Sequence, residues 1–174
     1  MVQSRLGDWM HIGFTGTRRG MTAAQEAVLR TILASFGAAV LHHGDCIGAD
    51  AQAHDVATSL GLEVVVHPPD IDTQRAWKTA SMMREPKPYL VRNKDIVRQT
   101  EMLIAASAEA EEQHRSGTWS TVRYARRSGR AIYVIGPDGT VALPEPGQLG
   151  QPGMAGAGGT AGDAAVPAGR GRPK

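Results

Sequence analysis

Apolar residues follow two alternating patterns along the chain. Short runs rich in Val, Ile and Ala have the character of buried strands, and they are separated by longer segments with apolar residues every three or four positions, the period of an amphipathic helix. The patterns predict strands at 11–16, 38–43, 62–67, 102–106 and 131–135, and helices at 23–36, about 50–60, 89–99 and 117–127.

The ends of these elements carry local signals. Thr22 is followed three residues later by Gln25, a capping box that opens the first helix. Gly37, Gly61 and Gly129 stand where helices should stop. The patterns therefore agree with the turn chemistry at most boundaries.

Strands that alternate with helices favour an α/β fold, a Rossmann-like three-layer sandwich with a mainly parallel five-stranded sheet and helices on both faces. Right-handed crossovers give the strand order 3-2-1-4-5, with the first strand in the middle. Ligands of such sheets lie beyond the carboxyl ends of the strands where the winding reverses. We therefore expect a site between the loops that follow the first and fourth strands.

Two segments depart from the alternation. Residues 68–88 combine prolines, charges and Met82-Met83, and are too long for a plain connection, so they are expected to form a lid or a partner surface. Within this insertion, Trp77, Met82 and Met83 are expected to cover the core, or else to stack on a base or contact a partner chain. Beyond residue 143 the chain is rich in Gly, Ala and Pro, which predicts a domain at 1–143 and a disordered tail at 144–174.

The tail ends in Arg170-Gly-Arg172-Pro-Lys, which is similar to the core of an AT-hook. Its arginines could enter an A/T-rich minor groove, or the segment could be a solubilising end.

Composition narrows the class of protein. The 174 residues, 41% hydrophobic and 21% charged, suit one globular domain, and no apolar run approaches the length of a membrane span. Cys46 is the only cysteine, so an internal disulfide is excluded and a reducing cytoplasm is expected. The formal net charge of +2 argues neither for nor against a nucleic-acid partner.

Glycine loops follow the first and fourth strands and concentrate hydrogen-bond donors. The first loop contains Gly16, Thr17, Arg18 and Arg19, and the fourth is Arg115-Ser-Gly-Thr118 at the start of a helix. Backbone amides at a helix start bind anions well, and arginines can neutralise them. The alternative is that Ser116 or Thr118 only caps the helix and that Arg18 and Arg115 are solvated.

The loop after the second strand contains Gly44, Asp45, Gly48 and Asp50. Asp50 could stabilise the start of the next helix without a ligand, or it could bind ribose hydroxyls or act as a general base. His43, Cys46 and His54 lie nearby, but their spacing matches no familiar metal site. We predict neither a metal nor a cofactor.

The helix at 117–127 carries Arg123, Arg126 and Arg127. Arginines in this arrangement could follow a nucleic-acid backbone or could form a solvated helix face.

Four motifs together resemble the SLOG superfamily, the Rossmann-like group that includes the DNA-processing protein DprA and the Lonely Guy phosphoribohydrolases. The resemblance spans residues 12–136 and is nearest to the YspA-like bacterial and phage branch. It rests on Gly13-Phe-Thr-Gly-Thr-Arg18, His43-Gly-Asp-Cys-Ile-Gly-Ala-Asp-Ala51, Arg92-Asn93 and Ser116-Gly-Thr118.

The resemblance implies a pocket for a nucleotide or nucleotide-derived ligand, with phosphate near Gly16 and Gly117 and with Arg92 and Asn93 in the site. Lonely Guy enzymes use a glutamate just after their Gly-Thr pair, where this chain has Trp119-Ser-Thr121. DprA-like proteins carry small polar residues there, but full DprA has flanking domains. Relatives commonly pair, so a homodimer through apolar residues of the helix at 89–99 is a further expectation.

Three functions therefore stand as hypotheses. The leading one is a nucleotide-binding sensor or accessory module. The second is an N-glycosidic hydrolase of nucleoside 5'-monophosphates, with Asp45 or Asp50 as the acid-base group. The third is a DprA-like DNA-binding accessory protein, held to DNA by the arginine helix and the tail.

Overall fold

The computed structural model of the chain describes residues 9–143. The predicted tail, including Arg170 and Arg172, lies outside the described residues. Four α-helices and seven strands make up the fold of these residues. Its strands are β1 (Met10–Gly16), β2 (Ala39–His43), β3 (Glu63–Val66), β4 (Met82–Met83), β5 (Met102–Ala106), β6 (Ala131–Ile135) and β7 (Val141–Ala142). Its helices are α1 (Ala23–Ser35), α2 (Ala49–Ser59), α3 (Tyr89–Arg98) and α4 (Gly117–Arg127), with a short 3₁₀ helix at Asp72–Gln74.

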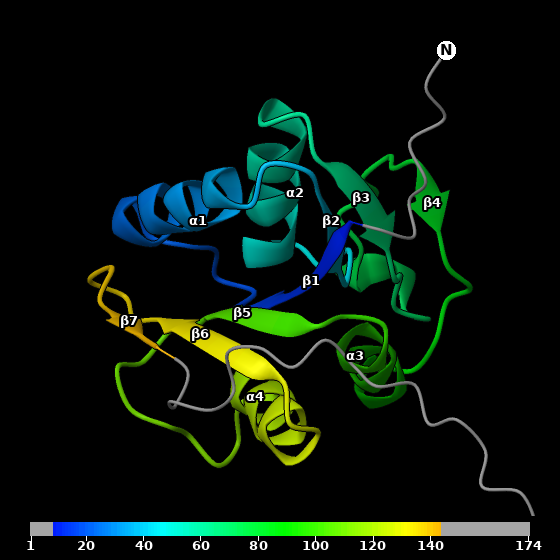
Figure 1. Cartoon of the computed structure of the whole chain (residues 1–174). Coiled ribbons are helices and arrows are strands. Elements are labelled where there is room, and N and C mark those ends of the chain that lie inside the picture. Colours follow the sequence, from blue (N-terminus) through cyan, green and yellow to red (C-terminus); the bar gives the residue numbers. More distant parts are fainter. Residues whose placement is uncertain (1–8, 144–174) are drawn as a thin grey trace, which may run out of the picture.

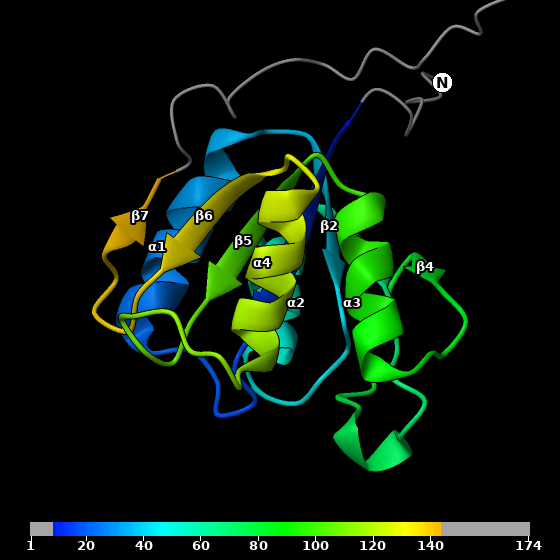
Figure 2. The same ribbon diagram turned by 90° about the horizontal axis from the view of Figure 1, so that it is seen from below.

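The sheet has the order β4-β3-β2-β1-β5-β6-β7. Its five longer strands follow the predicted order, with β1 in the middle, and all of them are parallel. Helices α1 and α2 cover one face, and α3 and α4 cover the other (Figures 1 and 2). The Rossmann-like α/β class is therefore confirmed.

The predicted number of five strands is wrong, because the sheet gains a short strand at each edge. Met82 and Met83 pair in parallel with Val65 and Val66, and β7 returns antiparallel to β6. A two-residue strand is too short to show an alternating pattern, so neither strand leaves a signal in the sequence.

The main core lies between the sheet and the helices α1 and α2. Ile12, Phe14 and Leu41 of the sheet are buried in it with Leu29 and Leu33 of α1. A smaller apolar cluster joins β5 and β6 to α4 through Leu103, Trp119, Val122 and Ile132. The predicted capping box is present: Thr22 Oγ1 accepts from the Gln25 amide at 3.1 Å, and Gln25 Oε1 accepts from the Thr22 amide at 3.0 Å.

The insertion at 68–88 contains β4, which it adds to the sheet beside β3 (Figure 1). Its large apolar side chains do not cover the core, contrary to expectation: Trp77, Met82 and Met83 are 61%, 41% and 49% exposed. The Trp77 ring instead stacks on Arg75, whose guanidinium carbon is 3.9 Å from the ring centroid. No helix within residues 9–143 has the length and apolar character to cross a bilayer.

Candidate functional site

A cavity of about 390 Å³ opens between the loops that follow β1 and β5, and we call it the rim cavity. Its volume is within the roughly 300–1,000 Å³ typical of small-molecule sites. The lining residues are Gly16, Thr17, Arg18, Arg19, Tyr89, Ala108, Glu109, Arg115, Ser116, Gly117 and Thr118. The structure thus brings together loops that are about a hundred residues apart, at the point where the winding of the sheet reverses.

The loop after β1 is held by its own hydrogen bonds. The Gly20 amide donates to the Thr17 carbonyl at 3.1 Å, and the Arg19 amide donates to Thr17 Oγ1 at 3.2 Å. Arg18 is exposed, and its Nη2 donates to Gln74 Oε1 at 2.8 Å. Arg18 is therefore placed at the edge of the cavity by the insertion.

Helix α4 begins at the cavity. Ser116 is its N-cap, and Ser116 Oγ accepts from the Trp119 amide at 3.4 Å. The amides of Gly117 and Thr118 make no hydrogen bond among the described residues. An anion at these amides would gain about 0.3–1 kcal/mol from the helix dipole.

Tyr89, the first residue of α3, packs against Gly117. A Cβ atom at position 117 would be 1.6 Å from Tyr89 Oη, so a larger residue there would displace the ring from this position. Burial raises the pKa of the Tyr89 hydroxyl. Tyr89 therefore remains a neutral phenol at the cavity wall.

The charge balance of the lining favours an anion. Three arginines, at positions 18, 19 and 115, face a single carboxylate, Glu109. Ser107 Oγ donates to the Glu109 carbonyl at 2.7 Å and so fixes the start of the loop that carries Glu109.

Arg123 and Arg126 hold the other end of that loop. Each pairs with Glu112, at 3.1 Å and 3.2 Å, and Arg123 also donates to the carbonyls of Gln113 and His114. Arg127 is exposed and makes no ion pair among the described residues. Of the three α4 arginines proposed as DNA contacts, Arg123 and Arg126 are thus engaged within the domain.

The loop at 44–50, which we call the buried loop, is filled by side chains. A Cβ atom at Gly44 would be 1.2 Å from Arg92 Nη1, so glycine makes room for this guanidinium. Asp50 Oδ2 accepts from the amides of Gly44 and Cys46 at 3.1 Å and 3.2 Å, and lies 3.7 Å from Arg92 Nη1. Burial raises the pKa of the Asp50 carboxyl, and the positive charge of Arg92 partly offsets this rise.

Asp45 ties the buried loop to the insertion. Its carboxylate accepts from Arg75 Nε at 3.0 Å and from the Lys78 amide at 3.0 Å. Its φ of 53° lies in the left-handed region. Asp45 is completely buried, so both its oxygens are used inside the protein.

Gly48 joins the buried loop to the loop after β1. A Cβ atom there would be 2.3 Å from the Arg18 carbonyl oxygen, and its φ of 91° also favours glycine. The next amide, of Ala49, donates to the Thr17 carbonyl at 3.0 Å. Asn93 plays a similar part between α3 and α4, where its Nδ2 donates to Thr121 Oγ1 at 2.7 Å.

Two histidines on the α2 side of the sheet bond to each other. His43 Nδ1 accepts from the Asp45 amide at 3.0 Å, and His43 Nε2 lies 3.0 Å from His54 Nδ1. Burial holds the pKa of His43 well below 6.5. Among residues 9–143, no group of three His, Cys, Asp or Glu side chains converges on a point where a metal would be held.

The predicted site residues therefore fall into two groups. Gly16, Thr17, Arg18, Arg115, Ser116, Gly117 and Thr118 line the rim cavity. Gly44, Asp45, Gly48, Asp50, Arg92 and Asn93 are not in its lining, and they pack behind it. Arg19, a donor of the first loop next to Arg18, also lines the cavity. Sequence reasoning missed Tyr89, Ala108 and Glu109 as site residues, and no local pattern marks them.

Solved structures with the same fold were found. A molybdenum cofactor binding protein from Rippkaea orientalis is 19% identical, with a TM-score of 0.60, and the match covers 74% of this chain and 77% of that one. DprA from Streptococcus pneumoniae is 20% identical, with a TM-score of 0.56, over 74% of this chain and 51% of that one. The Moco carrier protein from Chlamydomonas reinhardtii is 16% identical, with a TM-score of 0.53, over 72% and 75%.

No protein-family model and no curated protein matches the sequence. The likeness to DprA and to the two molybdenum cofactor proteins shows a shared fold. The chain spans about half the length of DprA.

Proposed function

We propose that the chain is a cytoplasmic module that binds a nucleotide or a nucleotide-derived ligand in the rim cavity. The observation that carries this proposal is the meeting of two glycine loops at one cavity with three arginines in its lining. In this function, the amides of Gly117 and Thr118 bind phosphate, and Arg18 and Arg115 neutralise it.

The remainder of the ligand would extend toward Tyr89 and Ala108, which contribute apolar surface to the lining. Solved structures of this fold include proteins described as binding the molybdenum cofactor and, for DprA from Helicobacter pylori, single-stranded DNA. The ligand class is therefore tested broadly, with nucleotides, dinucleotides and the molybdenum cofactor in one panel.

Thermal unfolding of the purified chain against this panel tests the proposal. A ligand at a hundred times its dissociation constant should stabilise the fold by about 2.7 kcal/mol. The response should disappear in Arg115→Ala and persist in Arg127→Ala, which removes an equal charge from the exposed side of α4. Absence of stabilisation by every member of the panel would overturn the proposal.

A second candidate function, cleavage of the base from a nucleoside monophosphate, is favoured by one observation. Glu109 is the only carboxylate in the lining of the rim cavity, whereas Asp45 and Asp50 are engaged in the buried loop. Glu109 then takes the acid-base role that the sequence analysis gave to Asp45 or Asp50. Incubation with nucleoside monophosphates, followed by chromatography for the free base, tests this second function, and Glu109→Gln is the control. If no monophosphate releases its base, the second function is ruled out.

A further inference from the structure

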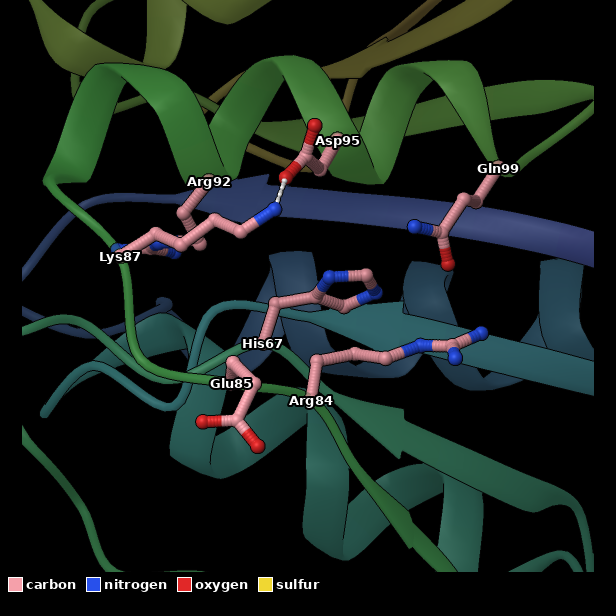
Figure 3. A pocket seen from close by; sticks show the side chains of 7 residues that line it. All are labelled: His67, Arg84, Glu85, Lys87, Arg92, Asp95 and Gln99. Atoms are coloured by element: carbon pink, nitrogen blue, oxygen red, sulfur yellow. Dashed lines mark hydrogen bonds and ion pairs between the residues drawn. The ribbon is translucent and has the colours of Figure 1, made fainter.

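A second cavity, of about 260 Å³, lies beside α3, and we call it the histidine cavity. His67, Arg84, Glu85, Lys87, Arg92, Asp95 and Gln99 line it (Figure 3). It shares no residue with the rim cavity. Its volume is below the roughly 300 Å³ at which sites for drug-sized ligands begin, so it suits a compact ligand.

His67 is the innermost of the lining residues and is only 2% exposed. Its Nε2 lies 3.0 Å from His42 Nδ1, and His42 Nε2 lies 2.8 Å from His11 Nδ1. Because β1, β2 and β3 are neighbours, the three imidazoles form a continuous chain across one face of the sheet. His67 Nδ1 has no hydrogen-bond partner among the described residues and is the end of this chain.

The direction of the hydrogen bonds decides what His67 offers to the cavity. A neutral imidazole has one N–H donor and one acceptor nitrogen. If His11 and His42 each donate from Nδ1, then His67 Nε2 accepts, and the proton of a neutral His67 must be on Nδ1, free to be donated. The opposite direction would leave His67 Nδ1 as an acceptor.

The other lining groups favour an anionic ligand, and such a ligand would accept from His67 Nδ1 in the first direction. Arg84 and Gln99 make no side-chain hydrogen bond among the described residues, and Arg84 has no ion pair there. Figure 3 shows the Arg84 side chain extending below His67 toward the region under Gln99, while the Glu85 carboxylate points away from the others. Lys87 is paired with Asp95 at 2.6 Å.

Arg92 adds a further positive charge at this wall. Its nearest carboxylate oxygen is on Asp50, 3.7 Å from Nη1, and its buried Nε has no hydrogen-bond partner in the described part of the chain. The lining therefore holds three cations against two carboxylates, together with donors on Arg84 and Gln99 that no described residue uses.

We propose that the histidine cavity binds a phosphate-type oxyanion, which accepts hydrogen bonds from His67 Nδ1, Arg84 and Gln99 and fixes the proton direction along His11, His42 and His67. This site is independent of the rim cavity and of any nucleotide bound there.

Proton binding and anion binding are linked at this site. Burial, followed by the charges of Arg84 and Arg92, lowers the pKa of His67 to about 4, with Asp95 acting in the opposite sense and Lys87 in the same sense. Burial and the imidazoles of His67 and His11 lower the pKa of His42 to about 3. A bound anion offsets the positive charges, so it raises the pKa of His67.

Imidazole ¹⁵N NMR of the full chain, titrated at pH 7 with inorganic phosphate, tests the proposal. The nitrogen shifts should show saturable conversion of His67, His42 and His11 to the form protonated at Nδ1, with no change in His43 or His54. Arg84→Gln should weaken phosphate binding about tenfold. The matched control, Arg127→Gln, should leave it unchanged.

A parallel titration with a nucleoside monophosphate identifies the source of the oxyanion. A response of His67 to phosphate alone supports a site for the free ion, and a stronger response to the monophosphate supports a site for the phosphate of a larger molecule. The amide signal of Gly117 reports the rim cavity separately. The proposal is overturned if His67 does not respond, or if its response is equally strong in Arg84→Gln.

Discussion

The buried loop and the loops around the rim cavity contain similar residues but differ in what occupies them. Both have glycines that allow close approach and amides that point inward. In the buried loop the amides of Gly44 and Cys46 donate to Asp50, and Arg92 fills the space that Gly44 leaves. At the rim the amides of Gly117 and Thr118 have no partner among the described residues.

The difference teaches that a glycine loop is a site only where the chain does not supply the counter-charge itself. Asp50 occupies the position of an anion in the buried loop, and Arg92 is its cation. The rim cavity has the cations but only one carboxylate. Substitutions in the two loops should therefore separate effects on stability from effects on binding.

The largest change in the free energy of unfolding should come from lowering the pH. Burial lowers the pKa of His42 to about 3 and of His67 to about 4, and it holds the pKa of His43 well below 6.5. The unfolded chain binds protons near pH 6.5 while the folded chain does not, so stability is present above this pH and is lost as the pH falls toward 4 and 3. Each unit of pKa difference corresponds to about 1.4 kcal/mol, so the loss should be several kcal/mol.

Urea unfolding between pH 7 and 4 measures this loss. Asp50 acts in the opposite sense, because its raised pKa lets the folded state bind a proton first as the pH falls, and this offsets part of the effect. The slope of the free energy of unfolding against pH reports how many protons the chain takes up on unfolding. His67→Gln should lower this number by about one. His114→Gln, at an exposed position, should not change it. A slope that is unchanged in His67→Gln would contradict the prediction.

The next largest effect should come from Asp50→Ala in the buried loop. Removal of this carboxylate leaves Arg92 buried without its counter-ion and two amides without an acceptor, which should cost about 3–5 kcal/mol. Denaturant unfolding at pH 7 measures it. Asp70→Ala, at an exposed position, is the matched control and should change stability by less than about 0.5 kcal/mol. A small loss in Asp50→Ala would mean that the buried loop is not held by this pair.

A pair of glycine substitutions should separate the two loops directly. Gly44→Ala places a Cβ 1.2 Å from Arg92 Nη1 in a closed environment, and overpacking of this kind costs about 1–3 kcal/mol. Gly117→Ala places a Cβ 1.6 Å from Tyr89 Oη, but the half-buried Tyr89 ring can move into the rim cavity.

Gly117→Ala should therefore keep most of the stability and lose ligand affinity about tenfold, equivalent to about 1.4 kcal/mol. Calorimetric titration with the ligand found in the thermal panel, together with denaturant unfolding, gives both quantities. If Gly44→Ala and Gly117→Ala lost the same stability, the buried loop and the rim cavity would not differ in whether side chains of the protein fill them.

The smallest effect should come from Arg126→Ala on α4. Arg126 is exposed and pairs with Glu112 at 3.2 Å, and exposed pairs contribute about 0–1 kcal/mol. Denaturant unfolding measures the change, and electrophoretic mobility with single-stranded DNA at two salt concentrations shows whether the helix binds nucleic acid. A large loss of DNA affinity in Arg126→Ala would indicate that the binding surface is α4 and not the rim cavity.

The sequence was sufficient to predict the central sheet. Strands such as Met102–Ala106 are completely buried, so their apolar runs carry the whole signal, and right-handed crossovers then fix the order. The edge strands β4 and β7 could not be predicted, because two residues hold too little pattern. Trp77 was misplaced because an aromatic residue in an insertion can stack on a cation, here Arg75, instead of on the core.

The site was predictable only where the topology decided the outcome. Gly16 and Gly117 follow strands that meet at the reversal of winding, so their meeting follows from the strand order. The position of Tyr89 depends on how α3 packs against α4, which no local pattern records. The exclusion of Asp45 from the lining depends on Arg75 and Lys78, which reach it from a segment without regular periodicity.

The close packing of Gly48 against the Arg18 carbonyl limits which parts of the rim cavity could close over a ligand. The loop after β1 and the start of α2 are fastened together there, so neither can shift without the other. Closure around a bound molecule would have to come from residues 108–116 on the far wall, which are mostly exposed. The wall formed by the loop after β1 and the start of α2 is thus fixed, and residues 108–116 are the part of the cavity that could adapt to ligands of different shape.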